Sequence, residues 1–223
     1  TIKSAFTRKP STRIAEPAAT PETAKHLRVL ITNLFVSHYS GSENVVQLLA
    51  AQLRRAGHAP VLFAPLLGPQ AEDLRAQGFE VVDRIDQVTL RPDVIHAQHL
   101  TPALIAMTRF REVPVVYTCH SSTYEIEAPM LHPQIRSYVA VDEKCAETCR
   151  ARGVPDDRLS VILNAVDMQR FQRRPPLPDR PLKALVLAKN RQHLETVRQA
   201  CSEAGLALDE AGGDADPVPL LRD

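Results

Sequence analysis

The fold is decided by residues 27–43, LRVLITNLFVSHYSGSE. Apolar side chains nearly fill residues 27–36, which predicts a strand covered on both faces in a parallel sheet. Residues 45–55 carry apolar side chains at helical spacing and end just before Gly57, which predicts a helix that stops there. Gly41 lies in the polar turn between the two. The free backbone N–H groups at such a helix start favour an anion.

The chain then repeats this strand-and-helix unit. Thr101, followed by Pro102, is predicted to be the N-cap of one of the later helices. Further strands are predicted at residues 59–64, 79–82, 93–97, 113–119, 138–141 and 159–163, and further helices at 70–77, 101–110 and 142–152. This alternation predicts an α/β fold, a Rossmann-like parallel sheet with helices on both faces, and ligands at the carboxyl ends of its strands.

Four segments are predicted along the chain. Residues 1–26 hold three prolines and a net charge of +3, which indicates a flexible basic leader, and residues 27–174 form the Rossmann-like domain. Residues 175–182 read as a proline-rich linker. Residues 183–223 supply a strand at 183–188, a helix at 191–204 and a strand at 206–209, too few elements to bury both faces of a sheet. We therefore expect an incomplete second α/β domain, whose open edge could promote self-association.

Composition excludes several classes of protein. The chain is 44% hydrophobic but only 4% aromatic, so its core is aliphatic. Outside the leader the net charge is −2, and no basic-aromatic interleaving occurs, so no nucleic-acid partner is expected. No apolar run reaches the roughly 20 residues of a membrane span, and no secretory signal is visible.

Four cysteines form no disulfide framework, which favours a reducing, cytoplasmic setting. Cys145 and Cys149 share one helix face and could suit a metal. A half-buried helix face explains them better, because no second Cys or His pair lies nearby.

Five motifs in order resemble the amino-terminal domain of the family 4 glycosyltransferases, which have two Rossmann-like domains facing across a cleft (the GT-B fold). They are GSE at 41–43, DVIHAQH at 93–99, VPVVYTCHS at 113–121, VAVDEKCAETCRARGVP at 139–155 and LSVILNAVDMQRF at 159–171. The resemblance covers residues 27 to about 213. It implies a retaining glycosyltransferase that uses a nucleotide-sugar donor and needs no metal or cofactor.

The chain also departs from the family pattern. Asp142 stands where the family usually has Ser, Ala165 where it has Gly, and one glycine remains in the turn at Gly41. If the backbone at Ala165 had a positive φ, that residue would be strained. The family's paired-Glu donor motif is not found after Gly213, so this chain is expected to be a weak or inactive catalyst alone.

The resemblance also suggests site residues. It implies that His120 is the catalytic residue that positions the donor sugar, and that Lys189 and Arg191 are the nearest candidates to hold the donor diphosphate. Gly41 and Ser42 could bind donor phosphate, or could form an ordinary strand-to-helix turn.

Acceptor-binding candidates are His96, His99, Ser121 and Glu125. For His96 and His99 a structural role explains the sequence equally well, and Glu125 and the nearby Glu127 could as easily be the solvated face of a helix. The acceptor could be a sugar, a lipid or another small molecule. Two alternatives stay open: a non-catalytic GT-B-like domain that binds a glycan or a protein, and a sugar-nucleotide epimerase.

Overall fold

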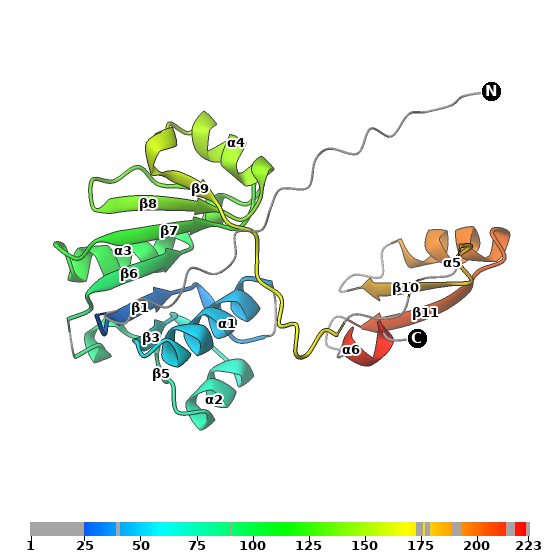
Figure 1. The fold of residues 1–223 in the computed structure, drawn as a ribbon, viewed down its shortest axis with the longest axis horizontal. Coiled ribbons are helices and arrows are strands. Elements are labelled where there is room, and N and C mark those ends of the chain that lie inside the picture. The colour runs from blue at the N-terminus through cyan, green and yellow to red at the C-terminus, as the bar shows by residue number, and fades with distance from the viewer. Residues whose placement is uncertain are drawn as a thin grey trace.

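The computed structural model describes residues 25–38, 41–89, 91–172, 176, 179–188, 193–212 and 217–221. These residues form a seven-stranded sheet with its helices, a two-stranded ribbon near Phe35, and a separate strand-helix-strand unit (Figure 1). The predicted leader lies almost entirely outside the described residues, and residues 175, 177 and 178 of the predicted linker also lie outside them.

The large sheet confirms the predicted Rossmann-like architecture. Its strand order is β5-β3-β1-β6-β7-β8-β9, and every neighbouring pair is parallel. The strands are β1 (Arg28–Thr32), β3 (Ala59–Phe63), β5 (Glu80–Val82), β6 (Val94–Gln98), β7 (Val115–Cys119), β8 (Ile135–Ala140) and β9 (Leu159–Val161). The order reverses between β1 and β6, which is where an open α/β sheet binds its ligands, at the carboxyl ends of the strands.

Helices cover both faces because alternate side chains of each strand point to opposite sides. Val46 of α1 and Leu74 of α2 pack with Ile31 on one face, whereas Ala106 of α3 and Cys149 of α4 pack in the core on the other. The helices are α1 (Gly41–Arg55), α2 (Pro69–Ala76), α3 (Leu100–Arg109) and α4 (Glu143–Ala151), with short 3-10 turns η1 (Ile85–Gln87), η2 (Glu125–Glu127) and η3 (Asp156–Arg158). Each lies within a few residues of its predicted range where one was predicted.

The predicted continuous strand at 27–36 is wrong, because β1 stops at Thr32. The Asn33 side chain donates to the carbonyl oxygen of Phe35 over 2.7 Å and turns the chain out of the sheet. Residues 35–36 then form β2 (Phe35–Val36), which pairs with β4 (Leu66–Leu67) in a separate parallel ribbon.

The start of α3 also differs from the prediction. The residue before the helix is His99, with a φ of 60°, and Thr101 lies inside the first turn. His99 is the only described non-glycine residue with a positive φ, so Ala165 is not strained in the way its sequence position suggested. Asp142 caps α4 by accepting a hydrogen bond from the Cys145 N–H over 2.7 Å, as a serine could.

The last described unit pairs β10 (Lys183–Ala188) with β11 (Ala207–Gly212) in parallel. Helix α5 (Leu194–Glu203) buries Leu194 and Cys201, and the short α6 (Pro217–Leu220) lies where a polar tail was predicted.

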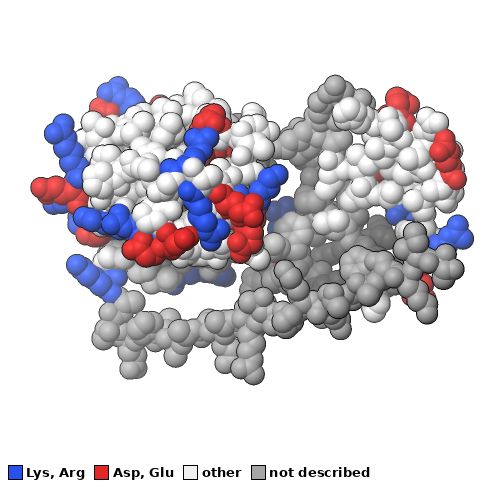
Figure 2. Space-filling model, turned by 90° about the horizontal axis from the view of Figure 1, so that it is seen from above, with Lys and Arg blue, Asp and Glu red and all other residues white. Residues whose placement is uncertain are grey.

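Charges of both signs are intermingled on the face of the sheet domain seen in Figure 2, so no patch of one sign forms there. No helix in the described ranges is long and apolar enough to cross a membrane.

Candidate functional site

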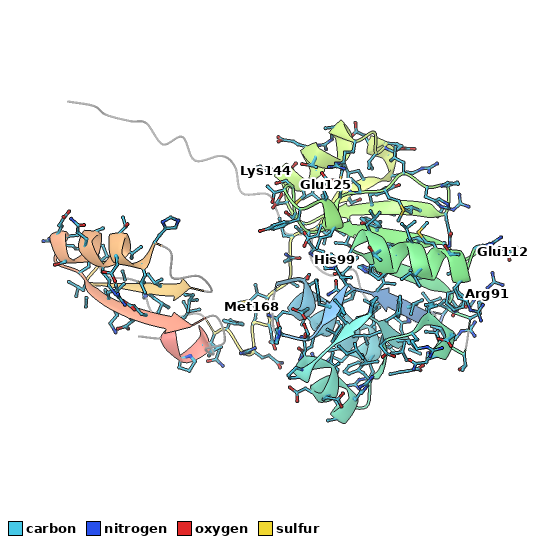
Figure 3. All side chains as sticks on the ribbon, turned by 180° about the vertical axis from the view of Figure 1, so that it is seen from behind. Arg91, His99, Glu112, Glu125, Lys144 and Met168 are labelled. Atoms are coloured by element: carbon cyan, nitrogen blue, oxygen red, sulfur yellow. The ribbon has the colours of Figure 1, made fainter. Side chains whose placement is uncertain are left out.

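Polar side chains converge where β1, β6 and β7 end and where η2 crosses nearby. These side chains lie at strand ends because, in the sequence, polar residues directly follow the apolar runs that form the strands. His99 follows β6 and His120 follows β7, and Figure 3 shows His99 at this edge of the sheet. The carboxyl ends of these parallel strands therefore bring together residues that are far apart in the chain.

His99 links three segments. Its imidazole is only 2% exposed. Nδ1 accepts a hydrogen bond from the backbone N–H of Leu34 over 3.0 Å, so Nδ1 carries the lone pair. The proton therefore sits on Nε2, which donates to Glu127 Oε1 over 3.3 Å. One neutral histidine thus ties the end of β1 to η2.

His120 is held in a defined tautomer by Gln98. His120 Nε2 donates to Gln98 Oε1 over 2.7 Å, which leaves the lone pair on Nδ1. Burial lowers the pKa of His120 to about 4, although the nearby Glu127 charge acts in the opposite direction. His120 is therefore neutral near pH 7 and presents Nδ1 as a hydrogen-bond acceptor.

His96 lies close to His120. Burial, and then the charge of His120, lower the pKa of His96 to about 4. His96 and Gln98 share one face of β6, and Gln98 is in register with Thr118 of β7. The sheet therefore places His96, Gln98, Thr118 and His120 in one group.

The predicted phosphate turn is organised by a buried carboxylate. Glu43 Oε1 accepts hydrogen bonds from Ser37 N (2.7 Å), Ser37 Oγ (3.1 Å) and His38 N (2.9 Å). Gly41 and Ser42 are the first two residues of α1. A methyl group added at Gly41 would meet no atom within 4 Å. Nothing within the described protein therefore requires a glycine at this position.

Two other candidates make different contacts. Ser121 Oγ accepts from the backbone N–H groups of Thr123 (3.0 Å) and Tyr124 (3.3 Å) and so shapes its own loop. Glu125 is exposed and pairs with Arg152 over 2.5 Å, outside the histidine group. Lys189 and Arg191 lie outside the described residues.

Sequence reasoning missed Gln98, Thr118 and the anchoring role of Glu43. A signal existed for Gln98, because it follows His96 by two residues and must share its strand face. In the described ranges, no group of three or more His, Cys, Asp or Glu is arranged to hold a metal. Cys145 and Cys149 are buried in the core, so this helix face is covered more completely than the half-buried face that the sequence predicted.

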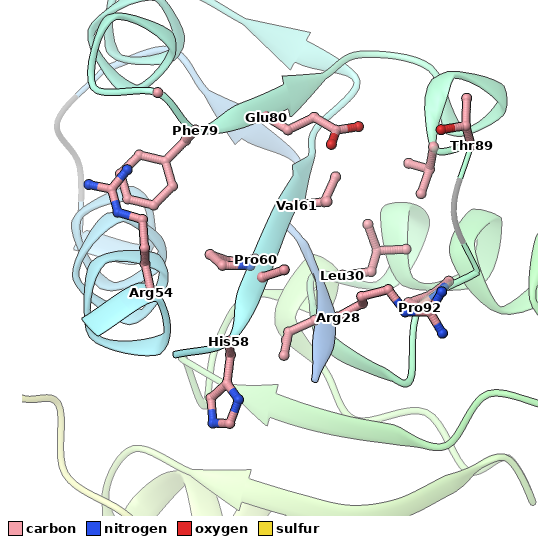
Figure 4. Close-up of a pocket in the computed structure, with 14 residues that line it drawn as sticks. Arg28, Leu30, Arg54, His58, Pro60, Val61, Phe79, Glu80, Thr89 and Pro92 are labelled. Atoms are coloured by element: carbon pink, nitrogen blue, oxygen red, sulfur yellow. The ribbon is translucent and has the colours of Figure 1, made fainter. Parts of the chain in front are cut away.

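A separate hollow of about 310 Å³ lies at the opposite, amino-terminal edge of the sheet (Figure 4). Two of its charged side chains, Arg28 and Arg54, already have partners. Arg28 pairs with Asp93 over 3.0 Å, and the Arg54 guanidinium lies 3.8 Å from the centre of the Phe79 ring. The starts of β1 and β3 line this hollow. The buried polar groups that lack partners lie instead at the carboxyl ends of the strands, which is why we place the candidate site there.

Solved structures share this fold. The Anabaena protein Alr3699/HepE in complex with UDP-glucose matches with a TM-score of 0.62 at 14% identity, over 88% of this chain and 71% of its own. The same protein in complex with UDP and glucose matches with a TM-score of 0.61 at 13% identity, over 84% of this chain and 69% of its own. A glycosyltransferase from Rickettsia africae gives a TM-score of 0.62 at 13% identity, over 88% and 71%. These likenesses establish the GT-B-type fold.

No curated protein sequence matches the chain. The profile of Glycosyltransferase Family 4, in contrast, matches residues 39–170, more than half of the sequence. That span contains His96, Gln98, His99, His120 and Glu127. The chain belongs to glycosyltransferase family 4.

Proposed function

We propose that this protein transfers a sugar from a nucleotide-sugar donor to an acceptor with retention of anomeric configuration. The observation that carries the proposal is the convergence of His120, Gln98, His96, His99 and Glu127 at the strand ends, within the family match. HepE, which shares the fold, is described in complex with UDP-glucose. A nucleotide sugar is the donor class that fits both observations.

The neutral state of His120 suits a sugar better than a phosphate. An uncharged imidazole with a free lone pair on Nδ1 accepts a hydrogen bond from a hydroxyl group. A diphosphate would need cationic groups or free N–H groups. In our proposal His120 positions the donor sugar, and the start of α1 at Gly41 and Ser42 lies beside the phosphates.

The 223-residue chain should turn over slowly by itself. Within the described ranges, no Lys or Arg forms a hydrogen bond or ion pair with the histidine group, so we expect the departing diphosphate to lack a cationic clamp from these residues. Lys189 and Arg191 are our candidates for part of it. We further propose that the reaction needs no metal or cofactor, that the transferred group is a hexose, and that it occurs in the cytoplasm, a location that suits four free cysteines.

The test is a long incubation with labelled nucleotide sugars and a panel of sugar, lipid and small-molecule acceptors. Release of the nucleoside diphosphate reports turnover, and proton NMR of the product reports its anomeric configuration.

His120→Ala should lower the rate of sugar transfer about a hundredfold. His132→Ala, in the same connection between β7 and β8, should not. A product of inverted configuration would contradict retention. Fast turnover would contradict the inference that the diphosphate lacks a cationic clamp. If the protein neither turns over nor binds any nucleotide sugar, the proposed function is wrong.

A further inference from the structure

Glu127 has one carboxylate oxygen that the protein does not satisfy. Oε1 accepts the His99 Nε2–H bond. Oε2 is buried and has no hydrogen-bond partner within the described residues. The side chain is only 14% exposed, so bulk water reaches little of it.

A purely structural anchor does not explain this arrangement. His99 needs one acceptor atom, and the amide oxygen of a glutamine would provide it without a charge. A buried carboxylate oxygen that no donor reaches destabilises the fold, because it has lost its hydrogen bonds to water. Its presence therefore indicates a donor that comes from outside the chain.

The surroundings restrict the chemistry of that donor. Six buried side-chain atoms lack a partner in the part of the chain that the structure describes, and five lie in this region: Asn33 Oδ1, His96 Nδ1, Gln98 Nε2, Thr118 Oγ1 and Glu127 Oε2. They include acceptors, a donor and a hydroxyl, and Glu127 is the only carboxylate among them. A phosphate would be repelled by that carboxylate. A hydroxyl group is uncharged and both donates and accepts, so a ligand with several hydroxyl groups suits this mixture of donors and acceptors.

We propose that Glu127 is a substrate-binding residue whose Oε2 accepts a hydrogen bond from a hydroxyl group of a bound sugar, with His99 as the positioning residue that holds the carboxylate. This inference rests on the proposed function, because it assigns the sugar of that reaction to a specific side chain. The hydroxyl can belong to the donor sugar or to a sugar acceptor, and the experiment separates the two.

Glu127→Gln is the informative substitution. Its amide oxygen still accepts the His99 proton, so the anchor is kept, while the second oxygen becomes an NH₂ group. Glu125→Gln is the matched control, because Glu125 lies on the same 3-10 turn, is exposed and pairs with Arg152 instead. Nitrogen-15 NMR should show His99 in the Nε2–H tautomer in the wild type and in both variants, which verifies the anchor independently of activity.

The measurements are the Kd values of UDP and of UDP-sugars by calorimetry, and the KM of the acceptor. If the donor sugar binds Glu127, E127Q weakens UDP-sugar binding roughly ten- to hundredfold and leaves UDP binding unchanged. If the acceptor binds there, its KM rises by a similar factor while donor binding is unchanged. Wild-type values for every ligand in E127Q would overturn the inference while leaving the proposed function intact.

A further experiment tests Glu127 even if the proposed function is wrong. If the wild type binds no nucleotide sugar, saturation-transfer NMR with glucose, mannose and N-acetylglucosamine tests the site directly. Sugar binding that E127Q loses and E125Q retains would support Glu127 as a sugar contact. Absence of sugar binding to the wild type would overturn both proposals.

Discussion

Two neutral histidines make stability depend on pH at the scale of single residues. Burial lowers the pKa values of His96 and His120 to about 4, from about 6.5 in an unfolded chain. Between pH 6.5 and 4 the unfolded state therefore binds more protons than the folded state. The stability contributed by these groups is complete above pH 6.5 and is lost as the pH falls towards 4.

His96→Gln should make this dependence shallower. Removing one histidine should reduce the slope of unfolding free energy by about 1.4 kcal/mol per pH unit between pH 6 and 4.5. Urea unfolding at a series of pH values measures the slope. Equal slopes in the wild type and the variant would contradict the lowered pKa of His96.

At the scale of elements, the turn before α1 is held from two sides. Glu43 accepts three hydrogen bonds from residues 37–38. On the other side Gly68 approaches so closely that an added Cβ would lie 2.8 Å from Ser37 Cα. The backbone at Ser37 and His38 is therefore held by packing and by a buried carboxylate, while Gly41 has open space around it.

Three substitutions separate these roles. Gly68→Ala should destabilise the fold by about 1–3 kcal/mol because the Ser37 backbone must move. Glu43→Ala should cost a similar amount, since the backbone N–H groups of Ser37 and His38 lose the carboxylate that accepts from them. Gly41→Ala should change stability by less than about 0.5 kcal/mol yet weaken donor binding if phosphate approaches there. Thermal unfolding and UDP titration measure the two effects; a strongly destabilised Gly41→Ala would show that the glycine is structural.

Sequence patterns predicted which elements exist better than where they end. Apolar runs identified every strand of the large sheet, because burial on both faces leaves little room for polar residues. They could not show that Asn33 would bend the chain out after Thr32, since a single side-chain hydrogen bond decides this. The partner of His120, Gln98, lies 22 residues away and meets it only through the register of β6 and β7. Strand-end histidines were therefore predictable as a group, whereas their hydrogen bonds were not.

At the scale of the whole molecule, the unit of β10, β11 and α5 leaves apolar side chains in solvent. Leu182 is 69% exposed and Leu187 is 49% exposed. Two strands and one helix bury too little surface to be stable independently. We therefore expect the purified chain to self-associate through this unit.

Light scattering across a range of concentrations tests this expectation. The mean mass should rise with concentration, and Leu187→Lys should reduce the rise because a charge on the strand opposes pairing. Leu104→Lys is the matched control, since Leu104 is 43% exposed on α3 of the large domain. A constant monomer mass, or an equal effect of both substitutions, would contradict the predicted interface.

The position of β1 between β3 and β6 has a consequence for the order in which the sheet forms. β1 meets β3 after one short crossover, but its other neighbour begins at Val94, 65 residues after Val29. Closing that longer loop costs more entropy, so the half containing β5, β3 and β1 should assemble first. During synthesis from the amino terminus, the backbone groups on one edge of β1 therefore have no partner strand until β6 has left the ribosome. Arg28 and Asp93, which join β1 to the segment before β6, would close this seam as the second half docks.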